Sequence, residues 1–251
     1  MLQDKVIIVT GAGRGLGQAY AVEAARLGAK VVAGDIIDCS DTVTRIESAG
    51  GTAIGVPLDV TKMDTVSAMA ADAVAAFGGI NVLINNAALY GGLTGGRFDM
   101  LDEDEWDRTM DVNVKGIWNC CKAVVPHLKT AGGGSIINVA SLAATYGLPF
   151  ALHYTTSKAA VIGMTRALAR ELGRNEIRVN AIAPTAVLTE GTAEFFGDKT
   201  DSAMDVIKGD QSLKRNPTPD DMIGTVMWLA SDSSGFVTGQ TIAIDGGTVM
   251  S

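Results

Sequence analysis

The sequence is poor in the side chains that hold metals or form disulfides. It has two histidines and three cysteines among 251 residues. Cys39, Cys120 and Cys121 form no C-x-x-C pair, and adjacent cysteines on a helix point about 100° apart. We therefore expect buried free thiols in a reducing compartment, and no metal site.

Positive charge and long apolar runs are also scarce. The 28 Asp and Glu outnumber the 20 Lys and Arg, which gives a net charge of -8. Such a chain repels a phosphate backbone, so nucleic acid is not an expected partner. Although 47% of the residues are hydrophobic, no run approaches the roughly 20 residues that span a membrane. No basic-then-apolar leader precedes the first apolar strand. We expect a cytoplasmic protein without a membrane partner.

Short apolar runs alternate with longer helical patterns along the whole chain. The runs expected to be strands are residues 5–10, 30–35, 53–59, 80–86, 134–141, 177–184 and 241–245. The helical patterns cover 15–28, 39–49, 61–77 with Thr61 as its N-cap, 102–111, 113–129 and 152–173. This alternation predicts a parallel sheet of seven strands with helices on both faces, a doubly wound α/β fold of Rossmann type. One domain over residues 1–251 is expected.

One stretch, residues 185–217, shows no periodic pattern. It is rich in Thr, Asp, Gly and Lys, and Phe195, Phe196, Met204 and Ile207 are scattered through it. A long insertion after the carboxyl end of a strand is typical of a binding loop. We expect this stretch to be an irregular lid over the substrate.

A glycine-rich turn, TGAGRGLG at 10–17, follows the first strand and opens the first helix. Gly11, Gly15 and Gly17 give the spacing G-x-x-x-G-x-G, whereas the commoner G-x-G-x-x-G would need glycine at Leu16. Glycines let the backbone turn tightly and approach a pyrophosphate, and the helix N-terminus supplies free N–H donors. The turn therefore predicts a dinucleotide site.

The residues after the second and third strands indicate which dinucleotide binds. Asp35 lies about 20 residues beyond the glycines, where a carboxylate can accept hydrogen bonds from the adenosine ribose. It would repel a 2′-phosphate, and Ile36 offers no cation to receive one. Arg14 is the counter-argument, because a basic residue in the glycine-rich loop could reach a 2′-phosphate. Taken together, Asp35 and Ile36 favour NAD over NADP as the cofactor. Asp59 and Val60, which end the third strand, are expected to lie beside its adenine.

Three polar residues point to the chemistry. Tyr154 and Lys158 are four apart on an expected helix, so they share one face. Ser141 ends the fifth strand, and the carboxyl ends of strands line the ligand crevice of a doubly wound sheet. A hydroxyl, a phenol and an ammonium are therefore expected to converge.

Together these motifs resemble the classical short-chain dehydrogenase/reductase family over essentially the whole chain. The matching motifs occur in the order and at the spacing typical of the family. They are TGAGRGLG, Asp35, Asp59-Val60, NNAA at 85–88, Asn113-Val114, Ser141, YTTSK at 154–158, NAIAP at 180–184 and IDGG at 244–247. Within the family, the C-terminal half is similar to 1-phenylethanol dehydrogenase-type members. One departure is Pro184-Thr185, where the family usually has Pro-Gly, so the loop beside the nicotinamide is expected to follow a different path.

The resemblance implies a role for each matching residue. Tyr154 would be the acid/base, and Ser141 would hydrogen-bond the substrate oxygen. Lys158 would bind the nicotinamide ribose and lower the pKa of the tyrosine, which is about 10 in free tyrosine. Asn113 would hold a water that links Lys158 to solvent. The other residues implied to contact NAD are Asn86, Ala87, Ala88, Pro184, Val187 and Thr189. His153 precedes Tyr154, but adjacent helical positions point apart, so we expect it to be a non-catalytic neighbour.

We expect an NAD-dependent dehydrogenase that interconverts a small secondary alcohol and a ketone. A hydrophobic or aromatic substrate is suggested only by residues near the expected pocket edges, namely Leu89, Tyr90, Leu142, Tyr146, Phe150, Phe195 and Phe196. A 3-oxoacyl-carrier-protein reductase and a sugar or polyol dehydrogenase stay open. A non-enzymatic NAD-binding sensor would predict a lost tyrosine or lysine. The helices at 113–129 and 152–173 are apolar or small nearly all round, which favours a homodimer or homotetramer built through them.

Overall fold

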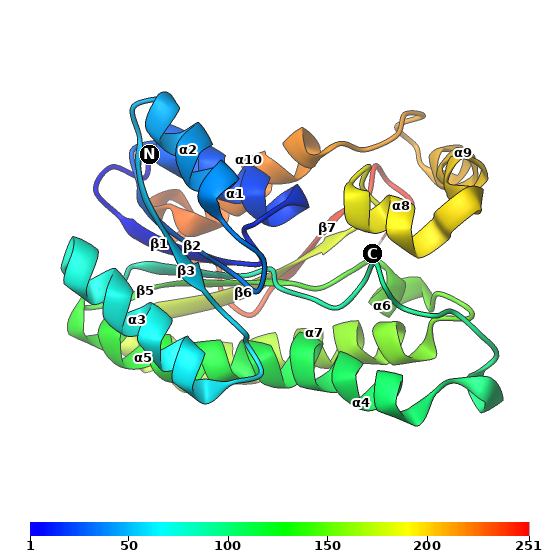
Figure 1. Ribbon diagram of the computed structural model, residues 1–251, viewed down its shortest axis with the longest axis horizontal. Coiled ribbons are helices and arrows are strands. Elements are labelled where there is room, and N and C mark those ends of the chain that lie inside the picture. The colour runs from blue at the N-terminus through cyan, green and yellow to red at the C-terminus, as the bar shows by residue number, and fades with distance from the viewer. Residues whose placement is uncertain (251) are drawn as a thin grey trace.

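Parallel strands form one continuous sheet in the computed structural model, which describes residues 1–250 (Figure 1). Their order is β3-β2-β1-β4-β5-β6-β7, and every neighbouring pair is parallel. The strands are β1 (Val6–Thr10), β2 (Lys30–Asp35), β3 (Thr52–Pro57), β4 (Val82–Asn85), β5 (Gly134–Val139), β6 (Ile177–Pro184) and β7 (Thr241–Ile244). The expected fold class, a single-domain seven-stranded Rossmann-type sheet, is confirmed.

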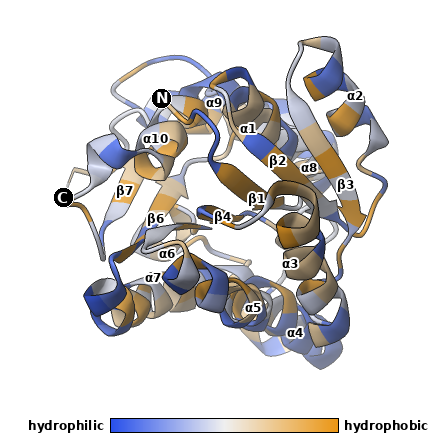
Figure 2. Ribbon diagram, turned by 90° about the vertical axis from the view of Figure 1, so that its left-hand side faces the viewer, coloured by the Kyte–Doolittle hydropathy of each residue, from blue (hydrophilic) through white to orange (hydrophobic). Residues whose placement is uncertain are grey.

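Helices cover both faces of the sheet (Figure 2). One face carries α1 (Gly15–Arg26), α2 (Ser40–Ser48) and α10 (Pro219–Ala230), and the other carries α3 (Met63–Phe77), α5 (Gly116–Thr130) and α7 (Leu152–Leu172). Successive residues of a strand point to opposite faces. In β1, accordingly, Ile7 and Val9 pack into one core and Ile8 packs into the other. Burial on both faces explains why the strands are almost continuously apolar.

The two helices expected at 102–111 and 113–129 form one continuous helical segment. Between α4 (Glu103–Met110) and α5 lies a π-helical turn, Asp111–Lys115, which contains Asn113. The expected N-cap at Thr61 is wrong. Its backbone N–H and hydroxyl both donate to the Asp59 carboxylate, and α3 begins two residues later.

The stretch 185–217 is not irregular, which corrects the sequence-based expectation. It contains α8 (Glu190–Phe196), a 3₁₀ turn (Gly197–Lys199) and α9 (Thr200–Asp210). Thr189 caps α8 by accepting a hydrogen bond from the Thr192 N–H. Short helices of one to three turns carry too few periodic positions to be seen against a polar composition. The remaining helical elements are 3₁₀ turns at Phe98–Met100, Gly173–Asn175 and Asp232–Ser234 and the single-turn α6 (Ala143–Tyr146).

All three cysteines lie among the described residues. Cys39, Cys120 and Cys121 are all buried and free, as expected. Within residues 1–250, no helix combines the length and the apolar character needed to cross a bilayer.

A buried polar chain links the middle of the sheet to α7. Asn138 of β5 is fully buried, and its amide donates to the Thr165 hydroxyl of α7 at 2.9 Å. Its carbonyl oxygen accepts from the Asn85 amide of β4, also at 2.9 Å. A buried amide with partners on both sides fixes the position of α7 against the sheet.

We predict that Asn138→Ala destabilises the fold. The Asn85 amide keeps only a weak contact with the Cys121 sulfur, 3.7 Å away. The cost should be about 1–3 kcal/mol, so the melting temperature should fall by roughly 2–12 °C. Ser202→Ala, on an exposed turn of α9, is the control and should melt like the wild type. Equal melting temperatures for Asn138→Ala and the control would contradict this role.

Candidate active site

The glycine-rich loop adopts a conformation that only glycine tolerates. Gly11 and Gly15 have φ of +67° and +59°, in the left-handed region where other residues are strained. A Cβ on Gly17 would collide with the carbonyl oxygen of Gly11. The pattern G-x-x-x-G-x-G is therefore demanded by the backbone of this loop.

The loop leaves donors free at the start of α1. Among residues 1–250, no protein acceptor lies within hydrogen-bond range of the N–H groups of Gly15, Leu16 and Gly17, and α1 has no side-chain N-cap. Three free N–H groups and the positive end of the helix dipole suit a pyrophosphate. Asn86 stabilises the loop, because its side-chain amide donates to the carbonyl oxygens of Thr10 and Gly11 at 3.0 and 3.1 Å.

Asp35 lies against this loop. Its carboxylate accepts the Gly13 N–H at 2.8 Å and the Ile37 N–H at 3.2 Å. Asp35 and the exposed Ile36 also line a second hollow of about 460 Å³ outside the carboxyl ends of β2 and β3. Asp35 therefore lies between the glycine-rich loop and this hollow, and its contact with an adenosine ribose stays a prediction.

Arg14 does not face Asp35. Its guanidinium forms a two-point contact with Glu194 of α8, at 2.6 and 2.9 Å, and lies 3.5 Å from Glu190. The hydrogen bond to Glu194 raises the pKa of Arg14 and lowers the pKa of the Glu194 carboxyl. The cation that argued for NADP is therefore turned toward α8.

Two residues expected beside the adenine have other partners. Asp59 accepts both hydrogen bonds from Thr61. Val60 is buried against Gly116, and its carbonyl oxygen accepts from the Asn119 amide. Asp59, Val60 and Ala87 do not line the hollow beside Asp35 or the large cavity at the start of α1, and their expected contacts with NAD stay predictions.

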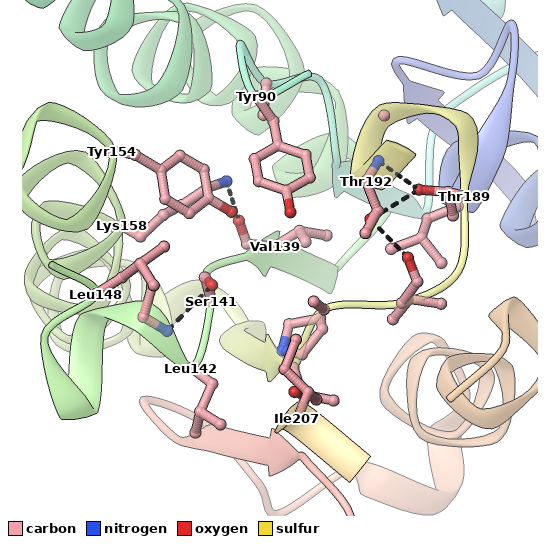
Figure 3. A pocket seen from close by; sticks show the side chains of 18 of the residues that line it. Tyr90, Val139, Ser141, Leu142, Leu148, Tyr154, Lys158, Thr189, Thr192 and Ile207 are labelled. Carbon is pink, nitrogen blue, oxygen red and sulfur yellow. Dashed lines mark hydrogen bonds between the residues drawn. The ribbon is translucent and has the colours of Figure 1, made fainter. Parts of the chain in front are cut away.

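One cavity of about 1000 Å³ runs from the start of α1 to the expected catalytic residues (Figure 3). The expected site residues that line it are Arg14, Gly15, Leu16, Asn86, Ala88, Ser141, Tyr154, Lys158, Pro184, Val187 and Thr189. Because β1, β4, β5 and β6 all end at this edge of the sheet, residues as far apart in the sequence as Arg14 and Thr189 line one cavity. The phosphate loop and the Ser-Tyr-Lys group thus belong to the same site.

Tyr154 and Lys158 are deeply buried, with 8% and 2% of their surface exposed. The Lys158 ammonium donates to the Val139 carbonyl oxygen at 2.8 Å and lies 5.7 Å from the centroid of the Tyr154 ring. Burial lowers the pKa of Lys158 to about 8. Burial also raises the pKa of Tyr154, and the hydrogen bond with Ser141 only partly opposes this rise.

The expected lowering of the Tyr154 pKa by Lys158 and a bound nicotinamide stays a prediction. In the chain by itself the tyrosine is a weaker acid than free tyrosine, because desolvation penalises the phenolate. One proton of the Lys158 ammonium is already donated to the Val139 carbonyl oxygen. A phenolate at neutral pH would need additional positive charge in the cavity.

Asn113 is buried in the π-helical turn and has no exposed surface. Its side chain accepts from the Leu89 N–H at 2.7 Å and donates to the Leu89 carbonyl and to the Ser157 hydroxyl, both at 3.1 Å. It therefore fastens the loop after β4 to α7. Asn113 does not line the cavity, so the expected water contact stays a prediction.

His153 points away from the cavity, toward α4. It is fully buried, its Nδ1 accepts from the Tyr154 N–H, and its Nε2 lies 3.5 Å from the Glu105 carboxylate. Among residues 1–250, no three His, Cys, Asp or Glu side chains lie close enough together to hold a metal ion.

The cavity walls are mostly apolar. Of the aromatic and aliphatic residues expected there, Tyr90, Leu142, Tyr146 and Phe196 line the cavity, whereas Leu89, Phe150 and Phe195 do not. The ring of Phe195 instead stacks on Tyr90 at 4.7 Å. Wall residues that sequence reasoning missed include Leu148, Thr248 and Val249, whereas Val206, Ile207 and Asp210 lie in the stretch expected to cover the substrate. Only the apolar spacing of 203, 206 and 207 within a short helix could have signalled part of this wall.

Comparison with known proteins places this geometry in a family. A family model described as Enoyl-(Acyl carrier protein) reductase matches residues 11–249. The chain belongs to the short-chain dehydrogenase/reductase family. It is 38% identical to the 3-oxoacyl-(acyl-carrier-protein) reductase of Thermotoga maritima, over 99% of each chain. It is 36% identical to the 2-dehydro-3-deoxy-D-gluconate 5-dehydrogenase of Escherichia coli, over 98% of this chain and 96% of the relative.

The fold agrees with that of solved family members. The structure of a short-chain type dehydrogenase/reductase from Mycobacterium ulcerans superposes with a TM-score of 0.92 at 29% identity, over 98% of this chain and 90% of that one. Members of this family generally use NAD or NADP, and the free N–H groups of α1 fit the pyrophosphate common to both.

We predict that Lys158→Met stabilises the fold at neutral pH. The pKa of Lys158 falls from 10.5 to about 8 on folding, so below pH 8 the folded state carries a buried cation. From the size of that shift, its cost is at most about 3 kcal/mol. Methionine removes this cost but leaves the Val139 carbonyl without a donor, so the net gain should be about 1–2 kcal/mol.

The pH dependence distinguishes this explanation from simple packing. In the wild type, stability rises between pH 8 and 10.5, since there the unfolded chain binds the proton that folded Lys158 has lost. The melting-temperature advantage of Lys158→Met should therefore shrink over this range. An advantage independent of pH, or none at pH 7, would show that the buried charge is not the cause.

Proposed function

We propose that this protein is an NAD-dependent dehydrogenase that interconverts a small secondary alcohol and a ketone. The observation that carries the proposal is the shared cavity. The free N–H groups of α1 lie at one end of it, and Ser141, Tyr154 and Lys158 lie at the other. The smaller hollow beside Asp35 and Ile36 contains neither the free N–H groups of α1 nor the Ser141, Tyr154 and Lys158 side chains.

The chain's own residues can supply the proton chemistry. The Tyr154 phenol, whose pKa burial raises, is protonated at neutral pH and can donate its proton to a developing alkoxide. The Ser141 hydroxyl lies within hydrogen-bond range of that phenol and orients the same substrate oxygen. Lys158 keeps a positive charge behind the ring and has a further proton to donate toward a ribose hydroxyl. When bound, the nicotinamide takes or supplies the hydride, and its oxidised form adds the positive charge that favours phenolate.

NAD is proposed over NADP because of the charges around the loop. Asp35 presents a carboxylate where a ribose would lie, and Ile36 beside it carries no charge. Thr189 and Val187 line the cavity beyond Pro184 and would contact the nicotinamide end.

The substrate is proposed to be hydrophobic or aromatic. Leu142, Leu148, Val206 and Ile207 make this part of the wall apolar. A sugar dehydrogenase is favoured by one observation, the carboxylate of Asp210 in the same wall, which could accept hydrogen bonds from hydroxyl groups. The names of the relatives fit that alternative and a 3-oxoacyl-carrier-protein reductase equally well.

Assembly through α5 and α7 is proposed as well. Trp118 of α5 is 49% exposed and Leu152 of α7 is 42% exposed. Burying such surfaces against a second copy would stabilise a homodimer or homotetramer.

The direct test is a substrate screen. Purified protein is incubated with panels of aliphatic, aromatic, sugar and 3-oxoacyl thioester substrates, together with NAD, NADH, NADP or NADPH, and the absorbance of the reduced cofactor is followed. Turnover of secondary alcohols with NAD supports the proposal. Turnover only of acyl thioesters with NADPH would replace it by the reductase alternative.

We predict that Tyr154→Phe abolishes turnover without affecting folding. The change removes one oxygen and keeps the ring packed against Tyr90. Turnover should fall at least 10²–10⁴-fold, as is typical of positioned proton transfer, while the affinity for NADH stays near that of wild type. Ser141→Ala should cost about 10²–10³-fold. Near-normal turnover by Tyr154→Phe would show that another group is the acid.

We predict that Asp35→Ala combined with Ile36→Arg shifts cofactor use toward NADP. A repelling carboxylate is removed and a guanidinium is introduced beside the ribose position. The kcat/KM for NADP relative to NAD should rise by roughly 10²-fold, equivalent to two charge-assisted contacts. A wild type that already prefers NADP would overturn the role of Asp35.

A further inference from the structure

The lid helix α8 is attached to the phosphate loop by an acidic side chain. Glu194 binds Arg14 through both carboxylate oxygens, at 2.6 and 2.9 Å. Glu190, one turn earlier on α8, adds a second carboxylate at 3.5 Å. These contacts join segments that lie 176 and 180 residues apart in the sequence.

The position of Glu194 is fixed from two further sides. Its carboxylate lies so close to Gly91 that a Cβ there would collide with it. The next residue, Phe195, stacks on Tyr90 with ring centroids 4.7 Å apart, and Tyr90 in turn lies 5.1 Å from Tyr154. The packing of Gly91 and Phe195 therefore places the half-exposed Glu194 side chain beside Arg14.

Arg14 begins close to the ribose position. It follows Gly13, whose N–H donates to Asp35 at 2.8 Å. A guanidinium on the next residue has the length to reach a phosphate attached to the ribose that Asp35 would hold. The side chain instead extends toward α8, and the Asp35 carboxylate accepts hydrogen bonds only from backbone N–H groups among the described residues.

We propose that Glu194, supported by Glu190, determines cofactor specificity by holding Arg14 on the lid and away from a 2′-phosphate. The inference rests on the proposed function, in which a dinucleotide occupies the loop. Discrimination against NADPH then has two parts. Asp35 repels the 2′-phosphate, and Glu194 engages the only loop cation that could bind it. The same contact closes α8 over the cavity.

The test measures binding, so it does not depend on knowing the substrate. The full chain carrying Asp35→Ala is titrated with NADH or NADPH, and binding is followed by the fluorescence of the reduced nicotinamide. The Asp35→Ala background removes the repulsion between Asp35 and the 2′-phosphate. Glu194→Gln in that background removes the charge of the partner and keeps its shape. The affinity for NADPH relative to NADH should then rise roughly tenfold, the worth of one released charge-assisted contact.

A double-mutant cycle assigns the gain to Arg14. Adding Arg14→Gln to Glu194→Gln should remove the gain, whereas Arg14→Gln alone should leave the NADPH-to-NADH ratio nearly unchanged. Asp205→Asn is the matched control, since that carboxylate lies on α9 of the same lid and pairs only with Lys208. It should leave the ratio unchanged.

The outcomes separate this inference from the proposed function. A gain that persists without Arg14, or a ratio that Glu194→Gln does not change, overturns the role of Glu194 alone. A fall in both affinities at constant ratio also overturns it and leaves Glu194 as a lid contact only. Wild-type protein that binds neither dinucleotide overturns the proposed function and this inference with it.

Discussion

The buried ammonium of Lys158 is the constraint on which the site depends. A charge with 2% of its surface exposed is costly, and the single backbone acceptor at Val139 offsets only part of that cost. The helix that carries it is accordingly fixed on several sides. Asn138 bonds Thr165 in its middle, and Asn113 bonds Ser157 one residue before the lysine. This rigidity places the phenol of Tyr154 one turn away against Ser141.

The sheet brings this charged helix to the phosphate loop. The strand order reverses between β1 and β4, and in open parallel sheets ligands bind outside the carboxyl ends at such a point. The loop after β1 supplies free N–H groups, and the ends of β4, β5 and β6 supply the walls. Two contacts between residues far apart in the sequence, Arg14 with Glu194 and Tyr90 with Phe195, join α8 to the glycine-rich loop and to the loop after β4.

Much of the fold and of the candidate site could be predicted from the sequence, because these features depend on local or periodic patterns of residues. Apolar runs predicted every strand, and the glycines predicted the loop because a positive φ leaves little choice of residue. Tyr154 and Lys158 were predicted to share a helix face by their spacing. The parts that were missed depend on contacts across the fold. The π-helical turn at Asn113 interrupts no visible pattern, the partner of Arg14 lies 180 residues away, and Thr248 and Val249 reach the cavity only through the placement of β7. The burial of Tyr154, which raises its pKa, is likewise not visible in any local pattern.

The central claim is that Tyr154 is a buried acid whose ionisation responds to charge placed in the cavity. The most direct measurement is the near-ultraviolet phenolate absorbance of wild-type protein minus that of Tyr154→Phe, followed as pH is raised with and without NAD. Without NAD, the difference signal should develop only above the value of about 10 for free tyrosine. With saturating NAD it should develop at clearly lower pH, because the oxidised nicotinamide and Lys158 then both favour the phenolate. Superimposable curves in the presence and absence of NAD would contradict the account.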